Sequence, residues 1–250
     1  MIASISRVKL FKSCRRAYQF RYIEDLEPVQ KAEALETGSN YHEELEDLYR
    51  NGGIAIVNHS KEEAMAVAYQ RYIYPKFEVK SVEEWMQKPI GNHILLGRVD
   101  GIAEDGLLVE HKTTSAEITE EYEYNLQWDE QILAYMYLTD AREVWYTVCR
   151  KPTIRQKKNE TDEEFFQRMV DWYDTETESR IRLLKISRTD EEVQDFAEGF
   201  KAICDEMERG VIYRNTNYCN CWGRRCEYSS ICLNYDPNQE YVEFVKGGRR

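Results

Sequence analysis

The sequence GRVDGIAEDGLLVEHK, residues 97–112, decides the fold of this chain. Apolar residues flank the loop Glu104-Asp105-Gly106, a pattern typical of a β-hairpin whose glycine adopts a left-handed conformation. In that register Asp100 lies directly opposite Glu110, with the two Cβ atoms about 5 Å apart. Lys112 projects from the same face as Glu110 because side chains alternate along a strand. The hairpin therefore brings two carboxylates and an ammonium group together.

This convergence predicts a cation site. Facing carboxylates repel each other unless a cation lies between them, and oxygen ligands of this kind suit Mg²⁺ or Mn²⁺. The alternative is an exposed hairpin whose wet face carries ordinary charges.

The composition is that of a soluble globular protein, with 42% hydrophobic and 32% charged residues in 250. No segment approaches the roughly 18 apolar residues that a membrane span requires. The stretch from Met1 to Lys12 has no apolar run, so we do not expect a signal peptide. We therefore expect a cytoplasmic protein with no membrane partner. Its seven cysteines are then thiols or metal ligands rather than disulfides.

The net charge of −12 argues against a passive nucleic-acid coat protein, but the charge is unevenly distributed. Basic residues gather between Arg7 and Arg21 and again between Arg150 and Lys158. A polyanion could therefore bind locally to a chain that is acidic overall. The alternative is that both runs are solvated surface. The predicted DNA contacts are Arg15, Arg16, Lys157 and Lys158.

Hydrophobic periodicity predicts helices over residues 6–22, 34–50, 61–74 and 125–138, and strands over 93–103, 107–112 and 143–149. The sequences Thr161–Glu164 and Thr189–Glu192 are capping boxes that open two further helices, the second ending at Gly210. We expect one domain over residues 1–250, with helices around a small mixed sheet.

Three further polar residues lie on predicted helices. His42 lies on the second helix, and Gln131 and Tyr135 are four residues apart on the helix after the hairpin, so they share a face. By themselves these residues are equally typical of ordinary surface or packing positions.

Taken together, the motifs resemble the RecB-like branch of the PD-(D/E)XK nuclease superfamily, and the resemblance extends over nearly the whole chain. That branch includes the CRISPR-associated adaptation nuclease, the nuclease domains of bacterial recombination helicases, and related phage exonucleases. The resemblance implies an α/β, restriction-endonuclease-like core in which helices flank a small mixed sheet that contains the hairpin. The matching elements, in chain order, are Ser4-Ile5-Ser6 with Cys14, Tyr18 and Tyr22, then Gly38 to His42, Gly97 to Asp100, Glu110 to Lys112, Gln131 to Tyr135, and a cysteine cluster.

The resemblance also implies roles for these residues. His42, Asp100 and Glu110 would be metal ligands, together with the backbone carbonyl of His111. Lys112 would orient and activate the attacking water and stabilise developing negative charge. The remaining pair, Gln131 and Tyr135, would position the DNA backbone or metal-bound waters.

Four cysteines fall within 14 residues of the tail, which indicates a metal centre in a reducing compartment. On the sequence alone a structural Zn²⁺ site bound by four thiolates is the simpler interpretation. The resemblance implies instead a 4Fe-4S cluster that ties residues 1–30 to residues 211–235. Its ligands would be Cys14, Cys219, Cys226 and Cys232, with Cys221 as the alternative to Cys219.

The expected function is that of a metal-dependent DNA nuclease, a single-stranded DNA exonuclease acting at DNA ends. A 5′-to-3′ polarity follows only from the resemblance, as do partners in recombination, phage or CRISPR adaptation systems. An alternative is a non-catalytic, cluster-bearing subunit that binds DNA ends. The intact set of Asp100, Glu110 and Lys112 argues against that alternative, because a binding subunit has no need of both carboxylates. A zinc-stabilised structural protein is a third possibility.

Overall fold

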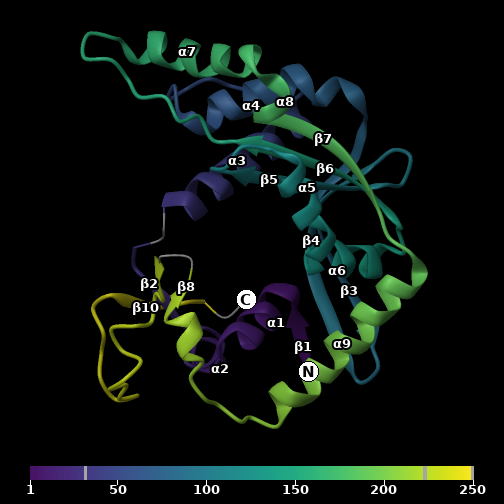
Figure 1. Cartoon of the computed structure of the whole chain (residues 1–250), viewed down its shortest axis with the longest axis vertical. Helices are drawn as coiled ribbons and strands as arrows, with labels where there is room; N and C mark the ends of the chain where they lie inside the picture. Colours follow the sequence, from purple (N-terminus) through teal and green to yellow (C-terminus); the bar gives the residue numbers. More distant parts are fainter. Residues whose placement is uncertain (31–32, 222–223, 249–250) are drawn as a thin grey trace. The chain divides into compact units, whose positions relative to one another are not determined.

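The computed structural model describes residues 1–30, 33–221 and 224–248, which form two compact units (Figure 1). We call Glu33–Met86 with Gly97–Gln194 the central unit. The terminal unit comprises Met1–Ala32, Gln87–Leu96 and Asp195–Arg250.

Within the described residues the main sheet has six strands in the order β1-β4-β5-β6-β7, with β3 also pairing with β4. The strands of this sheet are β1 (Ile2–Ser4), β3 (Val79–Ile90), β4 (His93–Ala103), β5 (Leu108–Thr114), β6 (Glu143–Arg150) and β7 (Ile181–Ser187). The β4–β5 and β6–β7 pairs are antiparallel, whereas β1–β4 and β5–β6 are parallel. The sheet is therefore mixed, as expected.

The helices of the central unit cover both faces of its part of the sheet (Figure 1). They are α3 (Glu33–Asn51), α4 (Lys61–Tyr72), α5 (Glu120–Asn125), α6 (Glu130–Thr139), α7 (Asp162–Thr175) and α8 (Thr177–Arg180), with 3₁₀ turns at Tyr74–Lys76 and Leu126–Trp128. The α/β fold predicted from the sequence, a mixed sheet flanked by helices, is confirmed.

Strand β6 shows how one sequence serves both faces of the sheet. Val144, Tyr146 and Val148 pack with Ile132 and Met136 of α6. The next side chain, Cys149, points to the opposite face and packs among residues of α3, α4 and α7. The two layers are a direct result of the alternation of side chains along a strand.

The predicted hairpin register is confirmed. Gly101 pairs with Val109 and Ile102 with Leu108, and next to these pairs the Asp100 carboxylate accepts a hydrogen bond from the backbone N–H of His111. Gly106 has a φ of 83°, and its N–H donates to the carbonyl of Ala103 at 2.9 Å. The three-residue loop with a left-handed glycine thus fixes which side chains face one another.

Both predicted capping boxes are present. In each, the threonine hydroxyl accepts from the backbone N–H of the glutamate, and the glutamate accepts from the threonine N–H. The second helix, α9 (Asp190–Glu208), is followed by Gly210 in a left-handed conformation, as predicted.

Two helix predictions are wrong in detail. The segment 6–22 is not one helix: Cys14 is extended, with φ −160°, between α1 (Ile5–Ser13) and α2 (Arg15–Tyr18), and a π-helix follows at Gln19–Ile23. The helix expected from residue 125 begins instead at Glu130, where the Asp129 side chain caps the N–H of Gln131. Apolar spacing continues through both breaks, so periodicity alone does not reveal them. Strands β3 and β7 were not predicted either.

In the terminal unit, segments from the two ends of the sequence lie side by side. Strand β2 (Leu26–Pro28) pairs antiparallel with β10 (Phe244–Lys246), and the Tyr228 hydroxyl donates to the Leu26 carbonyl at 3.0 Å. A 3₁₀ turn at Thr216–Tyr218 precedes the short strands β8 (Asn220–Cys221) and β9 (Arg224–Arg225). None of the described helices has the length and apolar character of a membrane span.

Candidate active site

The carboxylate of Asp100 lies between β5 and α3. Its Oδ2 accepts a hydrogen bond from the backbone N–H of His111 at 2.8 Å, and its Oδ1 lies 3.6 Å from Nδ1 of His42. Asp100 is 9% exposed. The structure therefore brings together two residues that are 58 positions apart in the sequence.

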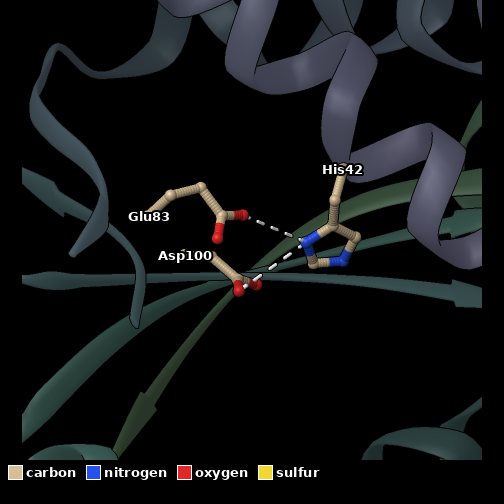
Figure 2. A group of neighbouring side chains, drawn as sticks. All are labelled: His42, Glu83 and Asp100. Atoms are coloured by element: carbon tan, nitrogen blue, oxygen red, sulfur yellow. Dashed lines mark ion pairs between the residues drawn. The ribbon is translucent and has the colours of Figure 1, made fainter. Parts of the chain in front are cut away.

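Glu83 of β3 joins this pair, which sequence reasoning did not foresee. Its Oε1 lies 3.7 Å from Nδ1 of His42, and the ligand atoms of His42, Glu83 and Asp100 all lie within 4.8 Å of one another. Figure 2 shows the His42 imidazole facing both carboxylates. The Arg98 Nε donates to the other oxygen of Glu83 at 2.7 Å, which fixes the orientation of the carboxylate.

The backbone at Glu83 explains why no sequence signal revealed it. Its φ is 55°, a left-handed conformation that is rare for a residue with a long side chain inside a strand. Such a conformation costs about 1–3 kcal/mol and persists only where surrounding contacts stabilise it. The strict alternation of a strand therefore does not give the direction of this side chain.

Glu110 and Lys112 of β5 lie beside this group. The Lys112 ammonium donates to Oε1 of Glu110, and Nε2 of Gln131 donates to the same oxygen at 3.0 Å. The other oxygen of Glu110 is buried and has no hydrogen-bond partner among the described residues. A buried carboxylate oxygen without a donor is costly, so it fits a position where a cation binds.

Burial and the neighbouring charges shift the titration of both residues. Burial, followed by the Asp100 carboxylate, raises the pKa of Glu110 to about 8, although the Lys112 ammonium acts in the opposite direction. Burial also disfavours the ammonium of Lys112, but the carboxylates of Glu110 and Asp100 outweigh this effect and raise its pKa. Binding of a cation at Glu110 would therefore compete with protonation of its carboxylate.

Gln131 and Tyr135 of α6 share a face, as predicted, because Nε2 of Gln131 donates to the Tyr135 hydroxyl at 2.9 Å. Gly97 of β4 lies beneath this helix. A Cβ at Gly97 would lie 2.7 Å from Cδ1 of Leu138 and 3.1 Å from Cε1 of Tyr135. A larger residue at position 97 would therefore require the side chains of Leu138 and Tyr135 to shift.

The ring of His111 is buried on the opposite side of β5. Its Nδ1 lies 2.7 Å from the Thr147 hydroxyl, which itself donates to the Glu110 carbonyl at 3.4 Å. Burial, and then the charges of His42 and Lys112, lower the pKa of His111 well below its usual value, so the ring is neutral. Its hydrogen bonds hold the backbone of β5 at the site, while a role for its carbonyl as a ligand stays a prediction.

Two carboxylates and one imidazole converge here on a single point, with Glu110 beside them. Hard oxygen donors with one nitrogen suit Mg²⁺ or Mn²⁺. These residues could hold a divalent metal ion.

The predicted cluster cysteines all belong to the terminal unit. Cys14, Cys226 and Cys232 contribute to one apolar cluster, and the N–H of Asn215 donates to the Cys14 sulfur at 3.4 Å. The N–H of Cys226 donates to the Cys219 carbonyl at 3.0 Å. The side chain of Cys221 lies outside the described part of the structure. Among the described residues, no cysteine belongs to a group of three or more ligand atoms within 4.8 Å. Cys149 and Cys204 are buried, as predicted.

The four predicted DNA-contact residues differ in their surroundings. Arg15 forms an ion pair with Glu206 and lies over the rings of Phe11 and Tyr213, 4.6 Å from each centroid. Arg16 donates to Gln19 at 2.8 Å and lies over the ring of Phe20. Lys157 and Lys158, by contrast, are exposed on the loop between β6 and α7.

Three solved structures of other proteins are similar to this chain. A putative exonuclease from Eubacterium rectale superposes with a TM-score of 0.54 at 13% identity, covering 96% of this chain and 90% of that one. A phage-related exonuclease from Haemophilus somnus gives 0.39 at 16% identity, covering 79% of this chain and 95% of that one. An alkaline exonuclease from Laribacter hongkongensis gives a TM-score of 0.39 at 16% identity, covering 83% of this chain and 88% of that one.

No curated protein is a match for this chain. The family model of the PD-(D/E)XK nuclease superfamily matches residues 2–233. This range is most of the chain and includes every site residue described above. The chain therefore belongs to the PD-(D/E)XK nuclease superfamily, as its motifs predicted.

Proposed function

We propose that this protein is a metal-dependent deoxyribonuclease that degrades single-stranded DNA from an end. The observation that carries the proposal is the convergence of His42, Glu83 and Asp100 beside the Glu110–Lys112 pair. In this proposal residues 1–250 act as one nuclease domain.

The metal ligands in the proposal are His42, Glu83, Asp100 and Glu110, with the backbone carbonyl of His111. A divalent cation supplies the positive charge that screens the phosphate, activates water and stabilises the leaving oxygen. Mg²⁺ and Mn²⁺ both suit this donor set.

The protein's own groups supply positioning and charge. The Lys112 ammonium is a compact charge at the Glu110 carboxylate, and it can hold a non-bridging phosphate oxygen or the attacking water there. Gln131 bonds to both Glu110 and the Tyr135 hydroxyl, so α6 can orient the sugar–phosphate backbone over the site. Both groups are held in place by regular secondary structure, which favours a preorganised site.

The exonuclease assignment and the 5′-to-3′ polarity rest on the sequence resemblance. The Eubacterium rectale protein that shares the fold is itself described as a putative exonuclease. Partners in recombination, phage or CRISPR adaptation systems belong to the same proposal.

We further propose that Cys14, Cys219, Cys226 and Cys232 hold a structural 4Fe-4S cluster in the terminal unit. Three of these thiols share one apolar cluster, and backbone hydrogen bonds connect Cys226 to Cys219 and Asn215 to Cys14. Thiolates suit both iron–sulfur clusters and Zn²⁺. Brown protein after anaerobic purification supports the cluster, and colourless protein with stoichiometric zinc supports the alternative.

The test of the nuclease is cleavage of oligonucleotides labelled at either end, with Mg²⁺, Mn²⁺ or EDTA. Wild-type protein should release nucleotides from the single strand only with metal, and the label that leaves first gives the polarity. Lys112→Ala should lose cleavage yet still bind Mn²⁺, whereas Lys80→Ala, which removes an exposed lysine of β3, should change neither. DNA binding without cleavage by wild-type protein at any metal concentration would favour the non-catalytic subunit instead.

A further inference from the structure

Trp85 and Arg98 form an exposed pair next to the proposed metal ligands. The guanidinium carbon of Arg98 lies 5.9 Å from the centroid of the Trp85 ring, and its Nε donates to Glu83 at 2.7 Å. Glu83 in turn lies 3.7 Å from His42. All four residues belong to the central unit.

Neither side chain is buried in the core of the central unit. Trp85 is 62% exposed and belongs to none of the apolar clusters of the described residues. The Arg98 side chain is 51% exposed, and its Nε donates to Glu83. A large indole that stays in water gives up the favourable free energy of burial, so it is available to a ligand.

We propose that Trp85 and Arg98 form a nucleotide subsite for the substrate strand, which deepens and rests on the proposed nuclease function. The indole of Trp85 stacks on an unpaired base next to the scissile phosphate. The guanidinium of Arg98 contacts a phosphate of the same strand through its free N–H groups.

The chemistry of the pair selects single-stranded DNA. An indole can stack only on a base whose face is free, and in a duplex the neighbouring bases cover those faces. Stacking on an aromatic side chain is tolerant of sequence because every base has a π-face. The cation beside the ring adds attraction for the anionic backbone.

Glu83 fixes the subsite relative to the reaction centre. One oxygen of its carboxylate accepts from Arg98 and the other faces His42. Arg98 therefore contacts one of the proposed metal ligands directly, so a base on Trp85 sets the position of the adjoining phosphate.

The experiment measures DNA binding in EDTA, by fluorescence anisotropy of a labelled single strand and of a small covalently closed circular duplex, which has no exposed terminal base pair. Trp85→Ala should weaken single-strand binding on the order of 10-fold, and Trp85→Phe should retain most of the affinity. Duplex binding should not change. The matched control is Tyr124→Ala, because Tyr124 is 53% exposed but lines a hollow with Leu184 and Arg188.

A single strand that lacks the base at each of its terminal positions in turn separates stacking from other causes. At one of these positions the missing base should weaken binding to wild-type protein, while Trp85→Ala should lose nothing further. With Mg²⁺ present, Trp85→Ala should raise KM and also lower kcat, because the scissile phosphate is then less well positioned. Arg98→Gln should weaken binding to both intact and base-free strands.

The proposal is overturned if Trp85→Ala binds the single strand as tightly as wild type, or if every base-free strand loses the same further factor with Trp85→Ala. Because binding is measured without metal, these outcomes are independent of cleavage. Wild-type protein that never cleaves would overturn the nuclease proposal, whereas the binding data would still decide the subsite.

Discussion

The two units of the molecule gather chemically competent side chains by different means. In the central unit the candidate site is assembled from strands β3, β4 and β5 and helices α3 and α6, and hydrogen bonds already connect its members. In the terminal unit Cys14 lies at a helix break, and Cys219, Cys226 and Cys232 lie in turns and irregular segments near the tail. Regular secondary structure preorganises the first set, whereas the second lies on irregular backbone. Variants of the two sets should therefore fail in different ways.

The largest effect is expected from Asp100→Asn and Glu110→Gln. Each variant removes one charged oxygen ligand, and a metal contributes several kcal/mol to transition-state stabilisation, so cleavage should fall on the order of 10³-fold. Thermal unfolding should change little, because the hydrogen bonds of the β5 backbone persist. The measurement is single-turnover cleavage with saturating Mg²⁺.

Glu104→Gln is the control on the same hairpin, since Glu104 is exposed in the turn. It should cleave at the wild-type rate. If Asp100→Asn also cleaves at that rate, the central unit has no metal site at this point.

Cys14→Ser should affect the fold rather than the chemistry. If a metal centre joins Cys14 to the tail, its binding free energy is also folding free energy. A loss of several kcal/mol corresponds to a fall in Tm of roughly 10 °C, at about 2–4 °C per kcal/mol. Iron and sulfide should disappear together with the brown colour.

Cys149→Ser and Cys204→Ser are the matched variants, because both thiols are buried outside the proposed cluster. They should keep full iron content. Full iron content in Cys14→Ser would place the cluster on the tail cysteines alone.

Metal binding in the central unit should depend on pH. Burial and Asp100 raise the pKa of Glu110 to about 8, so below this value the carboxyl is protonated and a cation must displace the proton. Apparent affinity for Mn²⁺ should rise by up to about tenfold per pH unit toward pH 8 and then level off. Calorimetry in buffers of different ionisation enthalpy measures the proton released. Glu110→Gln should release fewer protons, and equal release would exclude Glu110 as a ligand.

The two basic runs should also respond differently. Lys157→Glu with Lys158→Glu should weaken DNA binding by about an order of magnitude at low salt and flatten its salt dependence. The reason is that lysines bound to phosphates release the counterions condensed on the DNA. Arg15→Glu with Arg16→Glu should instead lower Tm, since both guanidinium groups pack on aromatic rings within the protein. Binding isotherms at several salt concentrations, with melting curves, measure both effects. Unchanged binding in the lysine variant would show that this loop is only solvated surface.

The smallest effect is expected at the hairpin turn. Gly106 has φ 83° and a Cβ there would meet nothing within 4 Å, so Gly106→Ala should cost only the backbone strain of about 1–2 kcal/mol. Gly199→Ala, inside helix α9 and also unobstructed, should stabilise by about 0.5–1 kcal/mol. Denaturant unfolding measures both. Equal effects of the same sign would mean that the turn does not require a left-handed residue.

Local chemistry explains how much of the fold could be predicted. The hairpin register follows from Gly106 and from alternation, and the capping boxes from the pairing of threonine with glutamate three residues later. Cys14 interrupts a helix whose apolar spacing continues unbroken, so only tertiary contacts such as that of Asn215 with Cys14 decide the break.

The residues of the candidate site also differ in how far the sequence predicts them. The geometry of Asp100 and Glu110 follows from local sequence, whereas His42, Gln131 and Tyr135 came from the ordered motifs of a family. Neither local sequence nor the family motifs predicted Glu83. Its direction depends on a left-handed backbone and on an ion pair with Arg98, and both are properties of the folded chain.

The absence of a side chain at Gly97 affects the candidate site through the packing of α6 on β4. A methyl group there would require the side chains of Leu138 and Tyr135 to shift, and the Tyr135 hydroxyl accepts a hydrogen bond from Gln131. An apolar substitution can in this way change the positions of polar groups in the site without removing any charged residue. Variants with side chains of increasing volume at residue 97 should therefore lower turnover in steps.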